Sequence, residues 1–319
     1  PATVSTLAEA EVFAKAGVRD IIYGVGISPD KLDRVVALHR AGCNLTVLLD
    51  CAAQADAVAK ASRDAGITIP AMIEIDSDGH RSGLTPQDAD LITVGRILHE
   101  NGAALRGVLC HAGDSYNAVG RTAQAACAEA ERLAVVTAAA ALKDAGLPCP
   151  VVSVGSTPTA HAATDLSGVT EMRAGVYVFF DLVMAGIEVC EVSDIALSVL
   201  TTVIGHQDKK QWVICDAGWM AMSRDRGTGN QQIDQGYGLV CDEAGMVIPD
   251  LMVLQANQEH GVIAVRPGSN GTMPDLPVGK RLRILPNHAC ATAAQHQGYY
   301  VVPETEGAAL LEWPRFGGW

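Results

Sequence analysis

Short apolar runs alternate with longer amphipathic stretches over the first 190 residues of this chain. The apolar runs are rich in β-branched residues and predict strands at residues 2–4, 20–24, 44–49, 69–75, 105–111, 150–154 and 170–173. The stretches between them predict helices at residues 6–16, 29–41, 52–65, 87–101, 119–145 and 158–163. Because strands and helices alternate one by one, the pattern favours an α/β fold with a parallel sheet.

The number of predicted strands decides between two α/β architectures. A closed (β/α)8 TIM barrel has eight strands, and the first strand predicted here begins at residue 2 with no element before it. We therefore expect residues 1–190 to form such a barrel, with its first strand missing from this sequence. The alternative is an open doubly wound sheet, for which the chain shows no GxGxxG turn.

A different pattern begins after residue 190. Short β-rich runs, separated by Gly, Pro, Asn and Asp, occur at residues 196–204, 211–214, 251–254, 261–265 and 281–284. No long helical period is found among them. Residues 191–319 therefore predict a second domain that is all β.

Composition and charge exclude several classes of protein. The 319 residues carry a net charge of −13, which argues against nucleic-acid binding because phosphate contacts need clusters of basic residues. No apolar run approaches the roughly 18–20 residues of a membrane span. The nine cysteines include no CxxC pair, so a reducing, cytoplasmic setting is expected.

Two side chains at the ends of predicted strands suit the binding of a flat ring. Arg81 follows the strand at residues 69–75, and His111 ends the strand at residues 105–111. In a barrel of alternating strands and helices, such residues meet at one face. The guanidinium of Arg81 would donate to a phenolate oxygen, and the His111 imidazole would stack on an aromatic ring. A surface salt bridge for Arg81 and a structural role for His111 are the alternatives.

Two glycine-bearing loops suit a phosphate group. Gly155, Ser156 and Thr157 precede a proline that favours a helix start, where free N–H groups bind phosphate. Gly175-Val176-Tyr177 follows the next strand, and barrels place phosphate sites after their last two strands. An ordinary helix cap is the alternative for the Ser-Thr pair. With Arg81 and His111, the two loops predict a site for a flat, phosphorylated cofactor.

The β domain carries one candidate pair of metal ligands. His288 and Cys290 are two residues apart after a predicted strand, so on an extended segment they would point to one side. Imidazole and thiolate both bind a borderline-soft divalent ion. Two ligands are too few for a structural zinc site, so water or substrate would complete the shell. A buried structural pair is the alternative.

Taken together, these motifs resemble a known family. Residues 76–83, 111–113 and 173–176 are similar to the strand-end motifs of the alanine-racemase-like barrel, which binds pyridoxal 5′-phosphate. The chain is more closely similar to the D-threonine aldolase branch, which includes the eukaryotic-type D-serine dehydratases. The matching residues are 154–159, 173–181, 216–227, 258–261 and 286–290. The resemblance covers essentially the whole chain.

The resemblance implies a role for each matching residue. Arg81 matches the arginine at the cofactor's phenolic oxygen, His111 the histidine stacked on the pyridine ring, and Tyr116 a tyrosine near that ring; His111 and Tyr116 are the catalytic candidates. The phosphate cradle would be Gly155, Ser156, Thr157, Gly175, Val176 and Tyr177. His288 and Cys290 match the metal site of the dehydratase relatives, with Mn, Zn or Mg as the ion.

One residue of the family is not matched. The family's Schiff-base lysine sits at the end of the first barrel strand, in a segment that precedes the residues aligned with 3–7 here. The lysines of this chain are Lys15, Lys31, Lys60, Lys143, Lys209, Lys210 and Lys280, and none corresponds to it. We therefore expect the lysine N-terminal to Pro1, on the strand missing from the barrel.

The resemblance implies an activity and its alternatives. The first expectation is a D-threonine aldolase that depends on pyridoxal 5′-phosphate and a divalent metal and cleaves D-3-hydroxy-amino acids to glycine and an aldehyde. The metal would act as a Lewis acid on the substrate's β-hydroxyl. A D-serine or D-3-hydroxyaspartate dehydratase and a non-catalytic cofactor-binding protein are the alternatives. We expect a homodimer that acts on a small molecule, a D-3-hydroxy-amino acid, and that binds neither nucleic acid nor a membrane.

Overall fold

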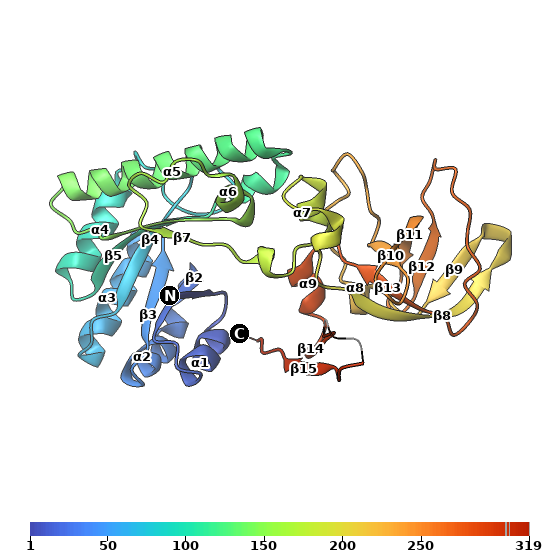
Figure 1. Cartoon of the computed structure of the whole chain (residues 1–319). Coiled ribbons are helices and arrows are strands. Elements are labelled where there is room, and N and C mark those ends of the chain that lie inside the picture. The colour runs from blue at the N-terminus through green and yellow to red at the C-terminus, as the bar shows by residue number, and fades with distance from the viewer. Residues whose placement is uncertain (304, 306, 319) are drawn as a thin grey trace. The chain divides into compact units, whose positions relative to one another are not determined.

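The computed structural model describes residues 1–303, 305 and 307–318, which form two compact units (Figure 1). The first unit comprises residues 1–175 together with residues from Phe316 onward, and the second comprises Val176–Arg315. The boundary falls after Gly175, whereas the sequence pattern places it after residue 190. The difference arises because the segment after Gly175 bonds within the second unit: Leu182 N donates to the carbonyl of Pro286, at 3.1 Å.

The first unit is built on a curled parallel sheet whose strands follow one another in chain order (Figure 1). The strands are β1 (Ala2–Val4), β2 (Asp20–Gly26), β3 (Asn44–Leu49), β4 (Pro70–Ile75), β5 (Ala104–Cys110), β6 (Val151–Val154) and β7 (Glu171–Met172). Each strand pairs in parallel with the next. Within the described residues, this sheet has seven strands and forms a half barrel, which confirms the expected α/β fold class.

Helices cover the outer face of this sheet. They are α1 (Leu7–Lys15), α2 (Leu32–Arg40), α3 (Ala52–Ala65), α4 (Asp90–Glu100), α5 (Arg121–Asp144) and α6 (Thr157–Ala162), with the short 3-10 turns η1 (Pro29–Lys31) and η2 (Gly113–Asn117). Alternate strand residues point outward into the main core with the helices, while Ile22, Leu48, Met72 and Leu109 form a smaller inner cluster. Local signals set the ends: α1 starts in a capping box of Thr6 and Glu9, and Gly66 ends α3 at a φ of +65°.

A charged pair fixes three strands near their amino ends. Arg106 of β5 donates from its Nη1 and Nη2 atoms to the two carboxylate oxygens of Asp20 on β2, at 2.8 and 3.1 Å. Arg106 also donates to the hydroxyl of Thr46 on β3. The guanidinium of Arg106 holds the pKa of the Asp20 carboxyl below its usual value. The loops that carry the predicted cofactor residues lie at the opposite edge of this sheet, where the strands have their carboxyl ends.

The second unit contains a closed antiparallel barrel, which confirms the expected β domain. Its strands are β8 (Val199–Gln207), β9 (Trp212–Cys215), β10 (Leu239–Cys241), β11 (Val247–Ala256), β12 (Gly261–Val265) and β13 (Arg281–Leu285), in the order β10-β11-β12-β9-β8-β13. Val203, Val253, Ile263, Leu282 and Ile284 are among the residues that fill its core. The unit also has α7 (Leu182–Gly186), α8 (Trp219–Met222), α9 (Ala289–Ala293), η3 (Val176–Val178), η4 (Val192–Asp194) and η5 (Asp208–Lys210).

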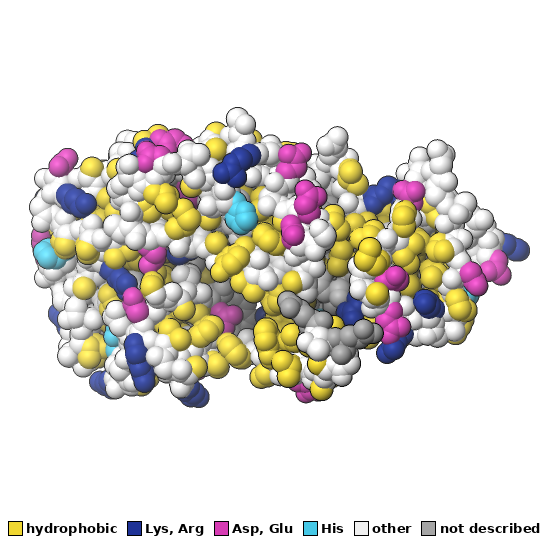
Figure 2. All heavy atoms as spheres, viewed as in Figure 1, with side chains coloured by type: hydrophobic (Ala, Val, Ile, Leu, Met, Phe, Trp, Pro, Cys, Tyr) yellow, Lys and Arg dark blue, Asp and Glu magenta, His cyan; other side chains and the backbone are white. Residues whose placement is uncertain are grey.

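A separate hairpin of β14 (Gly298–Val301) and β15 (Leu311–Pro314) follows the barrel in sequence. It exposes large apolar side chains, among them Tyr300 and Trp313, and yellow spheres gather at its place in the lower centre of Figure 2. Contiguous exposed apolar side chains mark interaction surfaces in many proteins. Among the described residues, no helix is long and apolar enough to cross a membrane.

Candidate cofactor and metal sites

The carboxyl ends of β4, β5, β6 and β7 lie along one edge of the first unit's sheet, because the strands are parallel and in chain order. The loops after these strands carry Arg81, His111, the segment Gly155 to Thr157, and Gly175. The structure therefore brings these predicted residues to one edge, where open α/β folds bind their ligands.

His111 continues β5 on the inner face of the sheet, and among the described residues one hydrogen bond holds its imidazole. Its Nδ1 lies 3.0 Å from the carbonyl oxygen of Gly155, so the proton is on Nδ1 and Nε2 is unprotonated. Burial lowers the pKa of His111, and the charge of Arg81 lowers it further. The ring of Tyr116 lies beside the imidazole, with centroids 6.1 Å apart and planes tilted by 43°. The neutral imidazole is thus fixed in orientation with one aromatic neighbour.

Arg81 lies in the loop after β4 and keeps donors available. Its Nη2 atom is 3.8 Å from Glu74 Oε1, and about half of its side chain is exposed, at 53%. Glu74 is buried and also accepts from the Ser82 hydroxyl at 3.1 Å, and its burial raises the pKa of its carboxyl. The ion pair is long, so Glu74 orients the guanidinium without using its five N–H groups.

The loop after β6 places one buried hydroxyl without a partner. Gly155 has a φ of +142°, and a Cβ there would lie 1.9 Å from the Arg173 carbonyl oxygen, so only glycine fits. Ser156 is the N-cap of α6, and its hydroxyl bonds to Ser115 at 2.8 Å and to Thr159 at 3.0 Å. The Thr157 hydroxyl is buried and bonds to no atom of the described residues. The predicted pair is therefore divided between one capping hydroxyl and one unpaired hydroxyl.

The second predicted loop spans the boundary between the units. Gly175 is the last residue of the first unit's main segment, and a Cβ there would meet no atom within 4 Å among the described residues. Val176 and Tyr177 begin the second unit in η3, and Tyr177 is half exposed, at 50%. Packing within the chain thus does not require the glycine, as expected of a position that a ligand approaches.

Three observations in the first unit fit a phosphorylated aromatic cofactor. A buried hydroxyl without a partner, that of Thr157, needs an acceptor or donor from elsewhere. A neutral imidazole, that of His111, presents a ring face for stacking. Open space at Gly175 leaves room for close approach of a ligand.

Sequence reasoning missed Glu131, a buried acid behind both loops. Glu131 lies on α5 and is 1% exposed, and burial raises the pKa of its carboxyl. It stands in the helix's buried stripe with Ala128, Val135, Ala138 and Leu142. An acid in the apolar stripe of an otherwise alanine-rich helix was the signal that could have revealed it.

The metal-ligand candidates have a different backbone from the one predicted. His288 is extended, with φ −136° and ψ 109°, but it is the N-cap of α9, so Cys290 lies in a helix and not on an extended segment. The prediction that both side chains lie on one side of an extended segment is therefore wrong. The helix starts there because Asp181, which is buried, accepts from the Ala289 N–H at 2.9 Å.

His288 nevertheless has a defined orientation. Its Nδ1 lies 2.7 Å from Asp225 Oδ2, and this bond, together with the nearby Cys290 thiol, raises the pKa of His288 to about 10. Pairing of Nδ1 with a carboxylate turns Nε2 away from it, as in metal sites where an acid orients the histidine ligand. Asp225 was also missed by the sequence reasoning.

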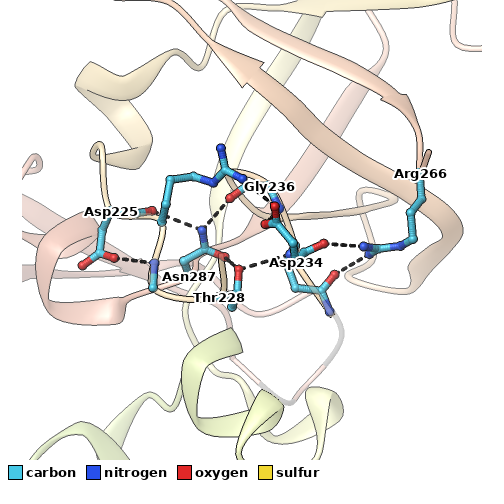
Figure 3. Close-up of polar contacts among 9 residues, drawn as sticks. Asp225, Thr228, Asp234, Gly236, Arg266 and Asn287 are labelled. Atoms are coloured by element: carbon cyan, nitrogen blue, oxygen red, sulfur yellow. Dashed lines mark hydrogen bonds and ion pairs between the residues drawn. The ribbon is translucent and has the colours of Figure 1, made fainter. Parts of the chain in front are cut away.

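Figure 3 shows the network that holds this segment, centred on Asn287. Asn287 is buried; its Nδ2 donates to the carbonyls of Asp225 at 3.1 Å and of Gly236 at 2.7 Å. The Thr228 hydroxyl donates to Asn287 Oδ1 at 3.1 Å, and Arg266 bonds to the carbonyl of Asp234 at the loop's far end. The loop carrying Asp225 is thereby tied to the residue before His288.

The candidate metal ligands in the second unit are the imidazole of His288 and the thiol of Cys290. The Asp225 carboxylate bonds to the imidazole. Within the part of the chain that the structure describes, no three His, Cys, Asp or Glu side chains form a group that could hold a metal ion. An imidazole nitrogen and a sulfur suit a borderline-soft divalent ion. The side chains fit a site completed by water or substrate oxygen, not a closed structural site.

Comparisons with known proteins match both parts of the chain. Residues 1–183 match the family model described as "Alanine racemase, N-terminal domain". Residues 196–302 match the model described as "Putative serine dehydratase domain". The two models thus follow the parallel sheet and the antiparallel barrel in turn.

Individual relatives are similar over nearly the whole chain. D-threo-3-hydroxyaspartate dehydratase of Delftia sp. (strain HT23) is 54% identical over 320 residues, which cover 99% of this chain and 84% of the relative. Its solved structure matches with a TM-score of 0.95 at 53% identity, over 99% of this chain and 84% of that one. A D-serine dehydratase of Dictyostelium discoideum is 28% identical, covering 94% and 78%. A D-threonine aldolase of Arthrobacter sp. is 28% identical, covering 93% and 74%.

Proposed function

Because the chain belongs to the alanine-racemase-like family and carries a second domain of the serine dehydratase type, we propose that it is a lyase that dehydrates a D-3-hydroxy-amino acid. The observation that carries the proposal is the 54% identity to a D-threo-3-hydroxyaspartate dehydratase over 99% of this chain. D-threo-3-hydroxyaspartate is accordingly the first candidate substrate. The comparisons support this dehydratase alternative better than the D-threonine aldolase that the motifs first suggest.

The first unit would hold pyridoxal 5′-phosphate, the cofactor that both matched families bind. When bound, the cofactor supplies an electron sink for the charge that develops at the substrate's Cα. The neutral imidazole of His111 would cover one face of the ring, beside Tyr116, and Arg81 would donate to the phenolate oxygen. The lysine expected N-terminal to Pro1 stays a prediction.

The phosphate group would be held by the cradle of Gly155, Ser156, Thr157, Gly175, Val176 and Tyr177. Within this set the structure supports Thr157 as the hydroxyl donor, because its buried oxygen has no partner in the described residues. The Ser156 hydroxyl is already bonded to Ser115 and Thr159, so Ser156 would shape the loop instead.

The second unit would hold a divalent metal through His288 and Cys290. When bound, the ion supplies a Lewis acid for the substrate's departing hydroxyl. Asp225 would keep His288 Nε2 turned toward the ion, because it bonds to Nδ1. A thiolate ligand favours zinc over magnesium and manganese. Solved structures of D-threo-3-hydroxyaspartate dehydratase, each 53% identical to this chain, include a cysteine-to-alanine variant in a metal-free form and a histidine-to-alanine variant.

Cleavage of the Cα–Cβ bond is the second candidate reaction, favoured by the 28% identity to D-threonine aldolase over 93% of the chain. Both reactions use the same substrate class and the same two sites. They differ in the bond that breaks: C–O in dehydration and C–C in the aldolase reaction. The products therefore discriminate between them on one substrate.

The test is product analysis with D-threo-3-hydroxyaspartate, the purified full-length protein, pyridoxal 5′-phosphate and zinc. Dehydration gives oxaloacetate and ammonia, whereas cleavage gives glycine and glyoxylate. We expect oxaloacetate, measured through NADH oxidation by malate dehydrogenase, and none from the L-enantiomer. Glycine and glyoxylate in equal amounts would move the assignment to the aldolase, and cofactor binding without either product would support a binding protein.

A homodimer is proposed as the assembled form. The exposed apolar side chains of the hairpin, Tyr300, Leu311 and Trp313, are more than half exposed each and suit burial against a second copy. Sedimentation of the wild type and of a Trp313→Ser variant tests this. A monomeric wild type would overturn the proposal.

A further inference from the structure

We infer that Glu131 is a positioning residue that fixes the ring-side and phosphate-side loops of the cofactor site in one geometry. The inference rests on the proposed function, because it assumes that pyridoxal 5′-phosphate binds at the edge formed by His111 and Thr157. Glu131 itself lies behind this edge on α5 and is not exposed to it, at 1% exposure.

The carboxylate of Glu131 accepts hydrogen bonds from two loops at once. Its Oε1 accepts from the Ala112 N–H at 3.1 Å, in the loop after β5, and from the Gly155 N–H at 2.9 Å, in the loop after β6. Its Oε2 accepts from the Thr159 hydroxyl at 2.8 Å, in the first turn of α6. All three donors are buried, so no solvent can replace the carboxylate as their acceptor.

The bond to Gly155 extends to the imidazole of His111. The N–H of Gly155 donates to Glu131, and its carbonyl accepts from His111 Nδ1 at 3.0 Å. Both polar groups of this glycine are therefore used, one on each side of the chain. Because Glu131 fixes the loop at Gly155, it also fixes the atom that sets the tautomer and ring direction of His111.

The bond to Thr159 extends to the phosphate side. Thr159 Oγ1 accepts from the Ser156 N–H at 3.1 Å, and the Ser156 hydroxyl accepts from the Thr159 N–H at 3.3 Å. The Ser156 hydroxyl donates to Ser115 Oγ at 2.8 Å, and Ser115 donates to the Ala112 carbonyl at 2.7 Å. The chain of bonds closes on the residue that Glu131 already holds. Every hydroxyl in it is occupied, so Thr157 alone in this segment is left for a ligand.

Two substitutions of Glu131 test the role of its carboxylate: one removes both oxygens, and the other keeps the size of the side chain and one oxygen. Glu131→Ala leaves the Ala112 and Gly155 N–H groups buried without acceptors. Glu131→Gln keeps one oxygen for those two donors and places its amide against Thr159, whose oxygen can accept. Ser62→Ala is the matched control: Ser62 is a buried residue of α3 whose hydroxyl accepts from the Ile69 N–H at 3.2 Å, at the amino end of β4.

The first measurement is the dissociation constant of pyridoxamine 5′-phosphate, a probe that carries its own amine and needs no lysine. For Glu131→Ala we expect a rise of about tenfold or more, for Glu131→Gln a rise of less than about threefold, and for Ser62→Ala no change despite a lowered melting temperature. Equal dissociation constants for wild type and Glu131→Ala would overturn the inference. So would a rise in Ser62→Ala as large as in Glu131→Ala.

The second measurement is the 15N NMR spectrum of the histidine side chains without any ligand. The wild type should show His111 with its proton on Nδ1, and Glu131→Ala should show a mixture of tautomers, while Ser62→Ala keeps the wild-type state. If Glu131→Ala does not fold, Thr159→Val replaces it in the titration. It removes the donor to Oε2 and the acceptor of the Ser156 N–H, keeps both bonds to Oε1, and should raise the dissociation constant. Wild-type-like binding by Thr159→Val would then count against the inference.

Failure of the proposed function gives a different result. Glycine and glyoxylate from the wild type, with the expected loss of affinity in Glu131→Ala, would replace the function and leave the inference standing. Oxaloacetate from the wild type, with unchanged affinity in Glu131→Ala, would support the proposed function and overturn the inference. No binding of pyridoxamine 5′-phosphate by the wild type would overturn both.

Discussion

The imidazole of His288 and the carboxylate of Asp225 form a direct polar pair, with Nδ1 2.7 Å from Oδ2. The two residues are 63 positions apart in sequence. They meet because Asn287, next to His288, bonds to the backbone of the loop that carries Asp225. The proposed metal ligand is thus oriented before any ion binds.

Asp225→Asn is expected to weaken metal binding without removing a ligand. An acid that orients a metal-bound histidine typically contributes about ten- to a hundredfold to metal affinity. The amide keeps the shape of Asp225 but lacks the charge that favours His288 with Nδ1 protonated. Zinc titration by calorimetry should show this loss, while Asp216→Asn, which removes an equal charge near Thr201, should bind zinc as the wild type does. Equal affinities for the two variants would contradict the orienting role.

Thr157→Val tests the phosphate side of the cofactor site. The substitution keeps the shape and removes a buried hydroxyl that has no partner among the described residues. A hydrogen bond to a charged group contributes about 1.5–3 kcal/mol, so the dissociation constant of pyridoxal 5′-phosphate should rise roughly ten- to a hundredfold. Fluorescence titration measures this change. An unchanged constant would show that the phosphate does not reach Thr157.

Ser156→Ala provides the contrasting result in the same loop. The Ser156 hydroxyl caps α6 and bonds to its neighbours. Its loss should therefore lower the free energy of unfolding by about 1 kcal/mol, as for other N-cap residues, with a smaller effect on cofactor affinity than Thr157→Val. A larger loss of affinity in Ser156→Ala than in Thr157→Val would reverse the assignment.

Much of the fold could be predicted because its signals are local. The strand expected at residues 44–49 is β3 (Asn44–Leu49), and the helix expected at residues 52–65 is α3 (Ala52–Ala65), which ends at Gly66. An apolar run and a glycine are enough to set such bounds. The strand β10 (Leu239–Cys241) was missed, because three residues carry no period and its pairing with β11 and β13 is set by the barrel.

The candidate site was predictable only where residues follow strands. Arg81, His111 and Gly155 stand at strand ends, so chain order alone brings them to one edge. Glu131 and Asp225 act through partners 24 and 63 positions away, and packing of helices and loops decides those contacts. The helical position of Cys290 was missed for a related reason, since the start of α9 depends on Asp181, far away in sequence.

Asp20 and Arg106 should make stability depend on pH at the acid end. Because Arg106 lowers the pKa of Asp20 below 3.8, the charged pair stabilises the fold above that value, and the stabilisation is lost as pH falls through the lowered pKa. The difference in urea midpoint between wild type and Asp20→Asn should be constant above about pH 5 and shrink below about pH 4. Arg106→Met should flatten the same dependence. A difference that does not vary with pH would contradict the ion-pair account.

Removal of the metal should separate cofactor binding from catalysis. His288 and Cys290 belong to the second unit, whereas Arg81, His111 and Thr157 belong to the first, so loss of the ion leaves the cofactor residues intact. A Lewis acid that acts on the departing hydroxyl supplies several kcal/mol, so EDTA or His288→Ala should slow formation of oxaloacetate by at least about a hundredfold. The visible absorbance of the bound cofactor should persist in both cases.

His206→Ala is the control, because His206 bonds to the carbonyl of Leu276 elsewhere in the second unit, and this variant should keep its activity. Full activity of His288→Ala in EDTA would mean that the histidine and cysteine form a structural pair and that dehydration proceeds without the ion.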